Sequence, residues 1–489
     1  MIHTFKYSLA LSLIVLGLAG GITAQEQDPL PEDAPEPVDR REAIDIGSEP
    51  SSRMVQPNPY TDNPSLNATT TRTRQGSWPL GSDGLLGNPF GLRGALEKDG
   101  IFVNGGVITM LGWNTEGGLA TDFYGGNLLS IGLTFQTDKL LGLDGGTLFT
   151  NYQQWTSFGG PFGNGQSFDA TGASNTSLSQ LPARLPLNQL SQLWYDQQLG
   201  STGLSIRFGK QDANLLFSAI PGSAAFVNGA AGYATTLNPY FPSYPEQAVG
   251  LIASWELDDT IVGRFGWFDG SNGAFDSETG GFIYSSGSRG PGNFFDNDGH
   301  WFFITECTYQ WMLGGQLSGS ISATGWLQTG KTGTSGNAPD GVQDVPGWLL
   351  YGGQTIWAPS EEIAKQGGGV VVFGQLGWSD PDKNPVNWSA NAGISATGVV
   401  PGRPADSLGL MGGYSSFSEN PDIYLSPSTS DTNGSPGGGE GFLEAYYLYQ
   451  ATPWLQVQPG IEWYSTPSGG DPASLSNALV FYLRIASEF

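Results

Sequence analysis

Five charged or amide side chains stand at alternate positions of segments whose intervening residues are largely apolar. They are Arg207, Gln211, Glu444, Glu462 and Arg484, and Tyr446, Tyr464 and Tyr482 share their faces. Guanidinium, carboxylate and amide groups exchange hydrogen bonds with hydroxyl groups, and aromatic rings cover C–H faces. This chemistry suits reversible contact with a polyhydroxylated solute. The alternative for each residue is a solvated strand position, paired with an opposite charge on a neighbouring strand.

Residues for bond-making chemistry are scarce. The sequence has one cysteine, Cys307, and two histidines, His3 and His300, which rules out a cysteine cluster and a multi-histidine zinc site. The run that starts at Asp296 is similar to the beginning of a calcium-binding loop, but Cys307 occupies the twelfth position, where such loops place a bidentate glutamate. We therefore predict no catalytic residue, no metal, no cofactor and no enzymatic activity.

The segments that position the candidate residues alternate with a period of two. In 130–136, Ile131, Leu133 and Phe135 share one face, and small or polar residues share the other. The segments 204–211 and 455–464 repeat this pattern, which predicts strands with two different faces. The composition agrees: 74 Gly suit tight turns, and 15 Trp, 18 Tyr and 26 Phe pack well on pleated surfaces.

The two-faced strands favour a barrel in a membrane. Beyond residue 75 no apolar stretch approaches the ~18 residues of a membrane-spanning helix, and a helical membrane protein is excluded. Alternation alone also fits a soluble β-sandwich. The last segment favours the membrane barrel over the sandwich. Its odd-numbered positions from Leu479 to Phe489 are apolar except Ser487. A terminal strand that ends in an aromatic residue is similar to the signal that hands outer-membrane barrels to their assembly machinery.

We predict an all-β fold, a transmembrane antiparallel β-barrel of about 16 strands. With ~10 residues per strand and the turns added, roughly 400 residues give a number of that order. A barrel of this size leaves an aqueous channel in its interior. The polar face of each strand is expected to line that channel.

Three regions are expected along the chain. Residues 1–24 carry Lys6 and an apolar run from Leu9 to Ala19, as in a cleaved secretory signal peptide. Residues 25–75 are acidic and rich in proline, which predicts a disordered extension. Residues 76–489 form the predicted barrel. The net charge of -26 argues against nucleic acid as a partner, and acidic loops would suit a lipopolysaccharide layer rich in divalent cations.

Several motifs occur in an order that resembles the carbohydrate-selective porins, from about residue 88 to the end. They are Tyr124-Gly125-Gly126, Trp194-Tyr195-Asp196-Gln197, Gly209-Lys210-Gln211-Asp212-Ala213-Asn214, Gly402-Arg403-Pro404-Ala405-Asp406, Pro453-Trp454, Gln458-Pro459 and Pro467-Ser468-Gly469-Gly470. The resemblance implies a 16-stranded barrel for the diffusion of sugars, with inward-folded extracellular loops that narrow the pore.

The resulting prediction is an outer-membrane channel for passive diffusion of carbohydrates into the periplasm. Its expected partners are mono- or oligosaccharides, outer-membrane lipid and lipopolysaccharide, and the barrel-assembly machinery. The alternatives are a general or ion-selective porin, an outer-membrane hydrolase, and a secreted β-rich binding module. The expected loops at 159–180, at 270–299 and around Pro427 carry no family motif, so the preferred sugar does not follow.

Overall fold

The computed structural model describes residues 85, 87–159, 187–271, 274–276, 281–283, 290–297, 299–332, 342–420, 423, 437–467 and 475–489. The predicted signal peptide, 1–24, and the predicted extension, 25–75, lie outside the described residues, and both stay predictions. The loop around Pro427 and nearly all of the loop at 159–180 also lie outside the described residues.

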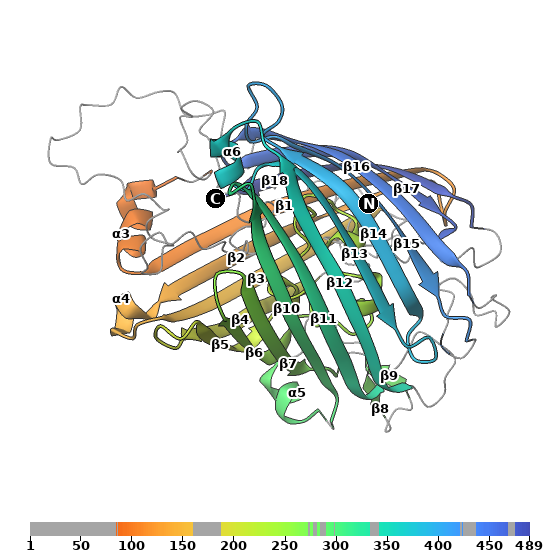
Figure 1. The fold of residues 1–489 in the computed structure, drawn as a ribbon, viewed down its shortest axis with the longest axis horizontal. Helices are drawn as coiled ribbons and strands as arrows, with labels where there is room; N and C mark the ends of the chain where they lie inside the picture. Colours follow the sequence, from red (N-terminus) through yellow and green to blue (C-terminus); the bar gives the residue numbers. More distant parts are fainter. Residues whose placement is uncertain are drawn as a thin grey trace.

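Sixteen long antiparallel strands of the described chain form one closed sheet (Figure 1). Each pairs with its neighbours in chain order, and β18 pairs back with β1, where Ile108 lies opposite Ala486. They are β1 (Ile101–Glu116), β2 (Phe123–Gln136), β3 (Gly146–Gly159), β4 (Leu187–Gln198), β5 (Leu204–Gln211), β6 (Ala248–Glu256), β7 (Ile261–Asp269), β10 (Trp301–Leu313), β11 (Leu317–Thr332), β12 (Val342–Trp357), β13 (Gly369–Ser379), β14 (Val386–Thr397), β15 (Ser407–Phe417), β16 (Gly439–Thr452), β17 (Leu455–Ser465) and β18 (Ala478–Glu488). The predicted barrel is confirmed, and its closure leaves no open edge.

Apart from three turns in the β5–β6 connection, the remaining elements are short and lie between the barrel strands or before β1. They are η1 (Pro89–Gly91), α3 (Leu92–Lys98), α4 (Thr137–Leu141), α5 (Pro291–Phe295), α6 (Glu361–Lys365), and a small hairpin of β8 (Ala274–Asp276) and β9 (Gly281–Ile283). Among the described residues, no helix has the length and apolar composition needed to cross a membrane.

The two ends of the barrel differ in their connections. The start of β1 and the end of β18 lie at one end, where turns such as 199–203 and 314–316 are short. The opposite end carries long connections such as 212–247 and 270–300. Outer-membrane barrels have short periplasmic turns and longer extracellular loops. By this rule we infer that the end with the chain terminus is periplasmic.

The two faces of the wall differ as the alternation predicts. On β17, Trp463 is 38% exposed, whereas its neighbours Glu462 and Tyr464 are 0% exposed. Large apolar side chains stay exposed around the outer face; they include Trp113, Phe123, Trp255, Trp348, Leu376, Trp378 and Phe481. Such residues are suited to contact with lipid. We call this exposed apolar surface the outer belt.

The last residue of the chain packs at the seam between β18 and β1. The backbone N–H of Phe489 donates to the carbonyl oxygen of Gly105 at 3.0 Å. The Phe489 ring lies so close to Gly105 that a Cβ there would collide with it. Glycine at position 105 thus leaves room for the ring, and the terminal aromatic residue is part of the wall.

The connection between β5 and β6, residues 212–247, packs against the inner wall of the barrel. It contains the short turns η2 (Ala213–Leu215), η3 (Gly229–Ala231) and η4 (Thr235–Leu237). Within this connection only Ala224 and Asn238 are exposed. We call residues 212–247 the inward segment.

Aromatic side chains of the inward segment form a core with the inner wall. The ring of Phe226 lies edge-on to Phe373 and to Tyr446, with centroids 5.7 and 4.8 Å away. Tyr240 lies 5.8 Å from Trp326. The interior is thus partly filled with apolar side chains, as the inward-folded loops implied by the family resemblance require. A barrel this wide cannot be filled by wall side chains alone, and the inward segment supplies the rest.

Candidate functional site

The carboxylate of Glu444 on β16 holds the backbone of the inward segment. It accepts hydrogen bonds from the N–H groups of Val227 at 2.9 Å and Asn228 at 3.0 Å, and from the Tyr482 hydroxyl at 2.8 Å. Glu444 is only 1% exposed. Hydrogen bonds to a carboxylate are stronger than neutral ones, especially away from water. Glu444 is therefore an anchor for this loop.

Asn228 extends the same anchor to β17. Its side-chain oxygen accepts from the N–H of Ala230 and so begins the turn η3. Its amide nitrogen donates to Glu462 at 3.3 Å and to the Tyr464 hydroxyl at 2.9 Å. One asparagine thereby fixes both the local turn and its distance from the wall. We call Glu444, Glu462, Tyr464 and Asn228 the β16–β17 anchor.

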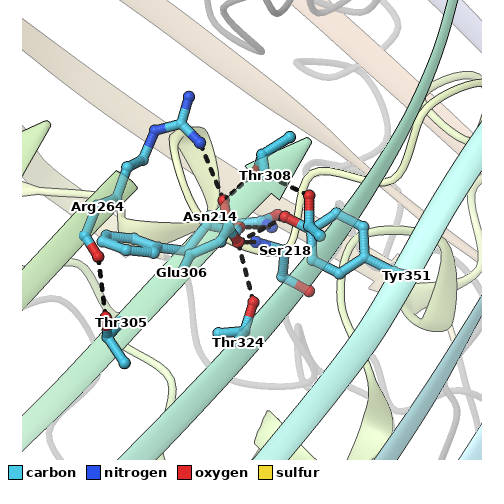
Figure 2. A network of polar contacts seen from close by, with 10 residues as sticks. Asn214, Ser218, Arg264, Thr305, Glu306, Thr308, Thr324 and Tyr351 are labelled. Carbon is cyan, nitrogen blue, oxygen red and sulfur yellow. Dashed lines mark hydrogen bonds and ion pairs between the residues drawn. The ribbon is translucent and has the colours of Figure 1, made fainter. Parts of the chain in front are cut away.

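A second carboxylate, Glu306 on β10, holds the beginning of the inward segment (Figure 2). It accepts from the backbone N–H of Ser218 at 3.1 Å, from Arg264 at 2.9 Å and from Thr324 at 3.1 Å. The Tyr351 hydroxyl also donates to it. Glu306 is 3% exposed, and the arginine balances its charge. A paired, hydrogen-bonded charge is the form in which a buried carboxylate is tolerated.

Amide side chains of the wall complete the attachment. Gln375 on β13 and Asn391 on β14 both donate to the carbonyl oxygen of Ala230, at 2.6 and 2.7 Å. Gln458 on β17 donates to the carbonyl oxygen of Ala225 at 2.7 Å. Together with Glu306, these contacts place the inward segment along the inner faces of β10 to β17.

Three of the sequence-predicted residues meet beneath the inward segment. Glu444 and Glu462 lie opposite each other on β16 and β17, and Arg484 on β18 donates to the side-chain oxygen of Gln458 at 3.1 Å. All three are between 0% and 2% exposed. In this conformation they support the loop and are covered by it. Their contact with a solute stays a prediction.

Arg207 lies elsewhere, in a group on β3 to β5 near the periplasmic end. It pairs with Asp196 on β4 at 2.9 Å, and its guanidinium lies 3.9 Å from the centroid of the Trp194 ring. The ring of Phe149 on β3 packs against the ring of Trp194, with centroids 5.1 Å apart. We call these four residues the Arg207 cluster. The ion pair is the cross-strand pairing that the sequence left open as an alternative.

The Arg207 cluster differs from the β16–β17 anchor in its access to water. The side chains of Arg207 and Asp196 keep 11% and 17% exposure. They combine donors, acceptors and aromatic rings, which is the set of groups that binds hydroxylated molecules. Gln211, the other predicted residue of β5, is buried and donates to the carbonyl oxygen of Gly250 at 2.9 Å, within the wall. It is not part of the cluster.

Sequence reasoning missed Glu306, and it did not identify residues 212–247 as a connection that folds inward. Glu306 is the one charged residue of β10, and a lone acid in such a strand was an available signal. Residues 212–247 contain only two charged residues, Asp212 and Glu246, and show no alternation. A long connection with so little charge is poorly suited to a solvent-exposed loop. That composition could have indicated a buried loop.

Two tyrosines of the inward segment are held in the neutral form. Desolvation inside the barrel raises the pKa of Tyr233, and the nearby charges of Asp212 and Glu246 raise it further. Burial raises the pKa of Tyr244 as well. A phenol in a desolvated site resists ionisation because the charged form loses its hydration. Both phenols therefore stay neutral at physiological pH.

Comparison with known proteins gives matches over most of the chain. The sequence profile described as "Carbohydrate-selective porin, OprB family" matches residues 124–489. Porin B of Pseudomonas aeruginosa is 21% identical over 436 residues, which cover 83% of this chain and 91% of that protein. The high-pH structure of Pseudomonas putida OprB has a TM-score of 0.67 at 19% identity and covers 84% of this chain and 100% of that one. The low-pH structure of the same protein has a TM-score of 0.52 at 15% identity, with 84% and 99% covered.

Proposed function

This chain belongs to the OprB family of carbohydrate-selective porins, and we propose that it lets carbohydrates diffuse passively across the outer membrane, past the Arg207 cluster. Family members are outer-membrane sugar channels, which agrees with the closed barrel and its outer belt. The observation that carries the finer proposal is the inward segment, because it covers the β16–β17 anchor and leaves Arg207 and Asp196 partly exposed.

The route of the solute follows from what the inward segment covers. Its contacts with Glu306, Gln375 and Glu444 place it against β10 to β17. The inner faces of β2 to β4 also carry buried polar groups, in which Asn151 contacts the hydroxyls of Ser130 and Ser191 at 2.9 and 2.6 Å. On β4 and β5, the side chains of Arg207 and Asp196 are partly exposed. We infer that sugars pass between the inward segment and β3 to β5.

The Arg207 cluster suits transient contact with a neutral sugar. Arg207 offers N–H donors, Asp196 offers acceptors, and Trp194 and Phe149 offer rings for C–H faces. The ion pair cancels the two charges locally, so the cluster favours neutral polar solutes over ions. A channel must exchange the hydration of a solute for contacts of similar strength without retaining it. The hydrogen bonds and ring contacts that exposed groups offer are similar in strength to the contacts of the solute with water.

Liposome swelling with the full purified protein tests this proposal. Wild type, Arg207→Ala and the control Lys365→Ala, an exposed residue of a periplasmic turn, are compared for entry of sugars and of size-matched uncharged non-sugars. We expect wild type to admit sugars faster, Arg207→Ala to lose that preference about fivefold, as for one hydrogen bond of ~1 kcal/mol, and the control to match wild type. Rates that depend on size alone in all three would mean a general porin.

The route to the membrane is part of the proposal. We infer that residues 1–24 are removed on export and that the strand ending at Phe489 is recognised by the barrel-assembly machinery. The outer belt and the acidic surface are proposed to meet outer-membrane lipid and lipopolysaccharide. Mass spectrometry of the protein isolated from outer membranes tests the first point. A mature chain that begins at Gln25 supports cleavage, and an intact Met1 overturns it.

A further inference from the structure

A row of neutral amide side chains crosses the inner face of the wall, from β3 to the end of the inward segment. Gln153 on β3 lies opposite Gln189 on β4, and the Gln189 amide donates to the side-chain oxygen of Gln247 at 3.3 Å. Gln211 on β5 lies opposite Ala248, the residue after Gln247. We call Gln153, Gln189, Gln192, Gln211 and Gln247 the amide row.

The amide row is buried, but its hydrogen bonds are incomplete. Its members are between 0% and 6% exposed. One side-chain atom of each has no hydrogen-bond partner among the described residues; these atoms are the oxygens of Gln153, Gln189 and Gln211 and the nitrogens of Gln192 and Gln247. The same holds for the indole N–H of Trp155, the next residue on the inner face of β3. Buried polar atoms are nearly always paired, so a group of such atoms in one place needs an explanation.

The unpaired atoms include donors and acceptors, and none carries a charge. The amide oxygens accept hydrogen bonds, whereas the amide and indole N–H groups donate them. An anion satisfies only the donors and a cation only the acceptors, but a hydroxyl group both donates and accepts. A neutral molecule with several hydroxyl groups is therefore the class of ligand that can pair with all of these atoms.

The amide row lies on the proposed route, ahead of the Arg207 cluster. Gln189 and Gln211 lie near the ends of their strands that carry the long connections, which we infer to be extracellular. The side-chain oxygen of Gln192 accepts from the indole N–H of Trp194 at 3.1 Å, and Trp194 belongs to the Arg207 cluster. A solute that enters from outside would therefore meet the row first and the cluster next.

Only neutral contacts are seen between Gln189 and the inward segment. Besides its contact with Gln247, the Gln189 amide donates to the carbonyl oxygen of Pro245 at 3.1 Å. The other side of the segment is held by the carboxylates of Glu306 and Glu444, and hydrogen bonds to ionised groups are stronger than neutral ones. The segment therefore separates from the wall more easily at Gln189 than at the carboxylates.

We propose that the amide row and Trp155 form a binding site for the hydroxyl groups of a neutral sugar. The inference rests on the proposed function, because it places a second sugar contact on the same route. The row is covered in this conformation, so binding separates Gln247 from Gln189. Sugar hydroxyls replace that contact and pair with the atoms that have no partner in the free protein.

Block of the ion current in planar bilayers measures binding, with glucose as the probe and triethylene glycol as an uncharged solute of similar size. Gln153→Met and Gln247→Met keep the length of the side chain and remove its polar atoms. Gln456→Met is the matched control: Gln456 is 3% exposed on β17, outside the row, and its side-chain oxygen also lacks a partner within the described part of the chain.

We expect each row variant to raise the glucose concentration for half-block about fivefold, as for loss of one neutral hydrogen bond. The control should match wild type. Equal weakening in Gln456→Met would mean that loss of any buried amide disturbs the channel, and it would overturn the site.

A charge variant separates contact with the sugar from support of the wall. Gln153→Glu keeps the shape of the side chain and makes the row negative. Compared with wild type, it should favour protonated glucosamine over glucose about fivefold, because a charged acceptor binds an ammonium group more strongly than an amide does. Equal changes in the half-block concentrations of both sugars would show a purely structural role and overturn the assignment.

Fluorescence in detergent gives a readout that depends neither on conduction nor on the folding of the glutamine variants. Glucose should change the emission of wild type, and the change should be smaller in Trp155→Phe, which keeps a ring but loses the N–H. An equal change in the two proteins would overturn the place of Trp155 in the site.

Failure of the amide-row site and failure of the proposed function give different results. If wild type distinguishes glucose from triethylene glycol and the row variants do so equally well, the amide row binds no sugar and the proposed function stands. If wild type treats the two solutes alike, the proposed function itself is contradicted, and the site falls with it.

Discussion

The inner faces of β16–β17 and of β4–β5 carry similar side chains, but the inward segment makes them different. Glu444 and Glu462 are buried and accept hydrogen bonds from residues 227 and 228, whereas Arg207 and Asp196 pair with each other and stay partly exposed. Charged residues of one inner wall thus anchor a loop in one place and, in the function we propose, meet a solute in another. The loop, more than the residue types, decides which use applies.

The difference predicts that loss of an anchor affects the whole channel. The largest effect is expected for Glu306→Ala, because it leaves Arg264 buried without its partner and the N–H of Ser218 without its acceptor. Breaking a buried ion pair costs about 3–5 kcal/mol. We expect a lower thermal midpoint in detergent and unsteady single-channel currents. Currents and a midpoint equal to those of wild type would remove Glu306 from the attachment of the loop.

A smaller effect is expected at the β16–β17 anchor. Glu444→Ala leaves two buried backbone N–H groups without their acceptor, and each costs about 1–3 kcal/mol. Release of this part of the inward segment should raise the conductance and reduce the preference for sugars. Glu444→Gln is the matched control, since an amide oxygen can still accept. If both variants conduct as wild type does, the anchor does not determine the width of the channel.

Acid sensitivity is expected at the periplasmic turn 398–406, outside both regions. Burial acts to raise the pKa of Asp406, but hydrogen bonds from Arg403 and Tyr447 outweigh it and lower the pKa below its ordinary value. A carboxyl with a depressed folded pKa stabilises the fold above the unfolded value of about 3.9, and this contribution is lost as the pH falls through the folded value.

We therefore expect the free energy of unfolding of wild type to fall by about 1 kcal/mol more than that of Asp406→Asn when the pH is lowered from 5 to 3. The thermal midpoint of wild type should fall more than that of the variant over the same range. Scanning calorimetry of the two proteins over this range provides the measurement. Parallel curves would show that Asp406 contributes no pH-dependent stability. Sugar transport at pH 7 should be alike in both, because this turn lies outside the proposed route.

The smallest effect is expected at Ser218, which has a φ of 60° in the left-handed region. This conformation costs a residue with a side chain roughly 1 kcal/mol, and glycine adopts it freely. Ser218→Gly should therefore keep the contact with Glu306 and raise stability slightly, offset in part by the greater entropy of the unfolded chain. Stability reduced by more than about 1 kcal/mol would mean that the Ser218 side chain itself holds the loop.

Alternation was sufficient to predict the strands at 130–136, 204–211, 455–464 and 479–489, because each side chain's face is decided by its own position in the sequence. Gln458 and Trp463 lie inside and outside as their spacing on β17 indicates. The inward segment could not be placed in this way. Val227 and Glu444 are 217 positions apart, and no local pattern links a loop to the wall that it covers. For the same reason, Glu444 was predicted to face the lumen, but its hydrogen bonds to the loop were not.

Modification of Ala224 tests most directly whether solutes pass beside the inward segment. In a Cys307→Ser background, Ala224→Cys places a thiol at an exposed position of the segment, and Ser415→Cys places one at a wall position that the segment covers. A bulky methanethiosulfonate reagent is added during recordings in planar bilayers. We predict that Ala224→Cys reacts and that its current falls sharply, while Ser415→Cys does not react. Modification of Ala224→Cys without any change in current would contradict the proposed route.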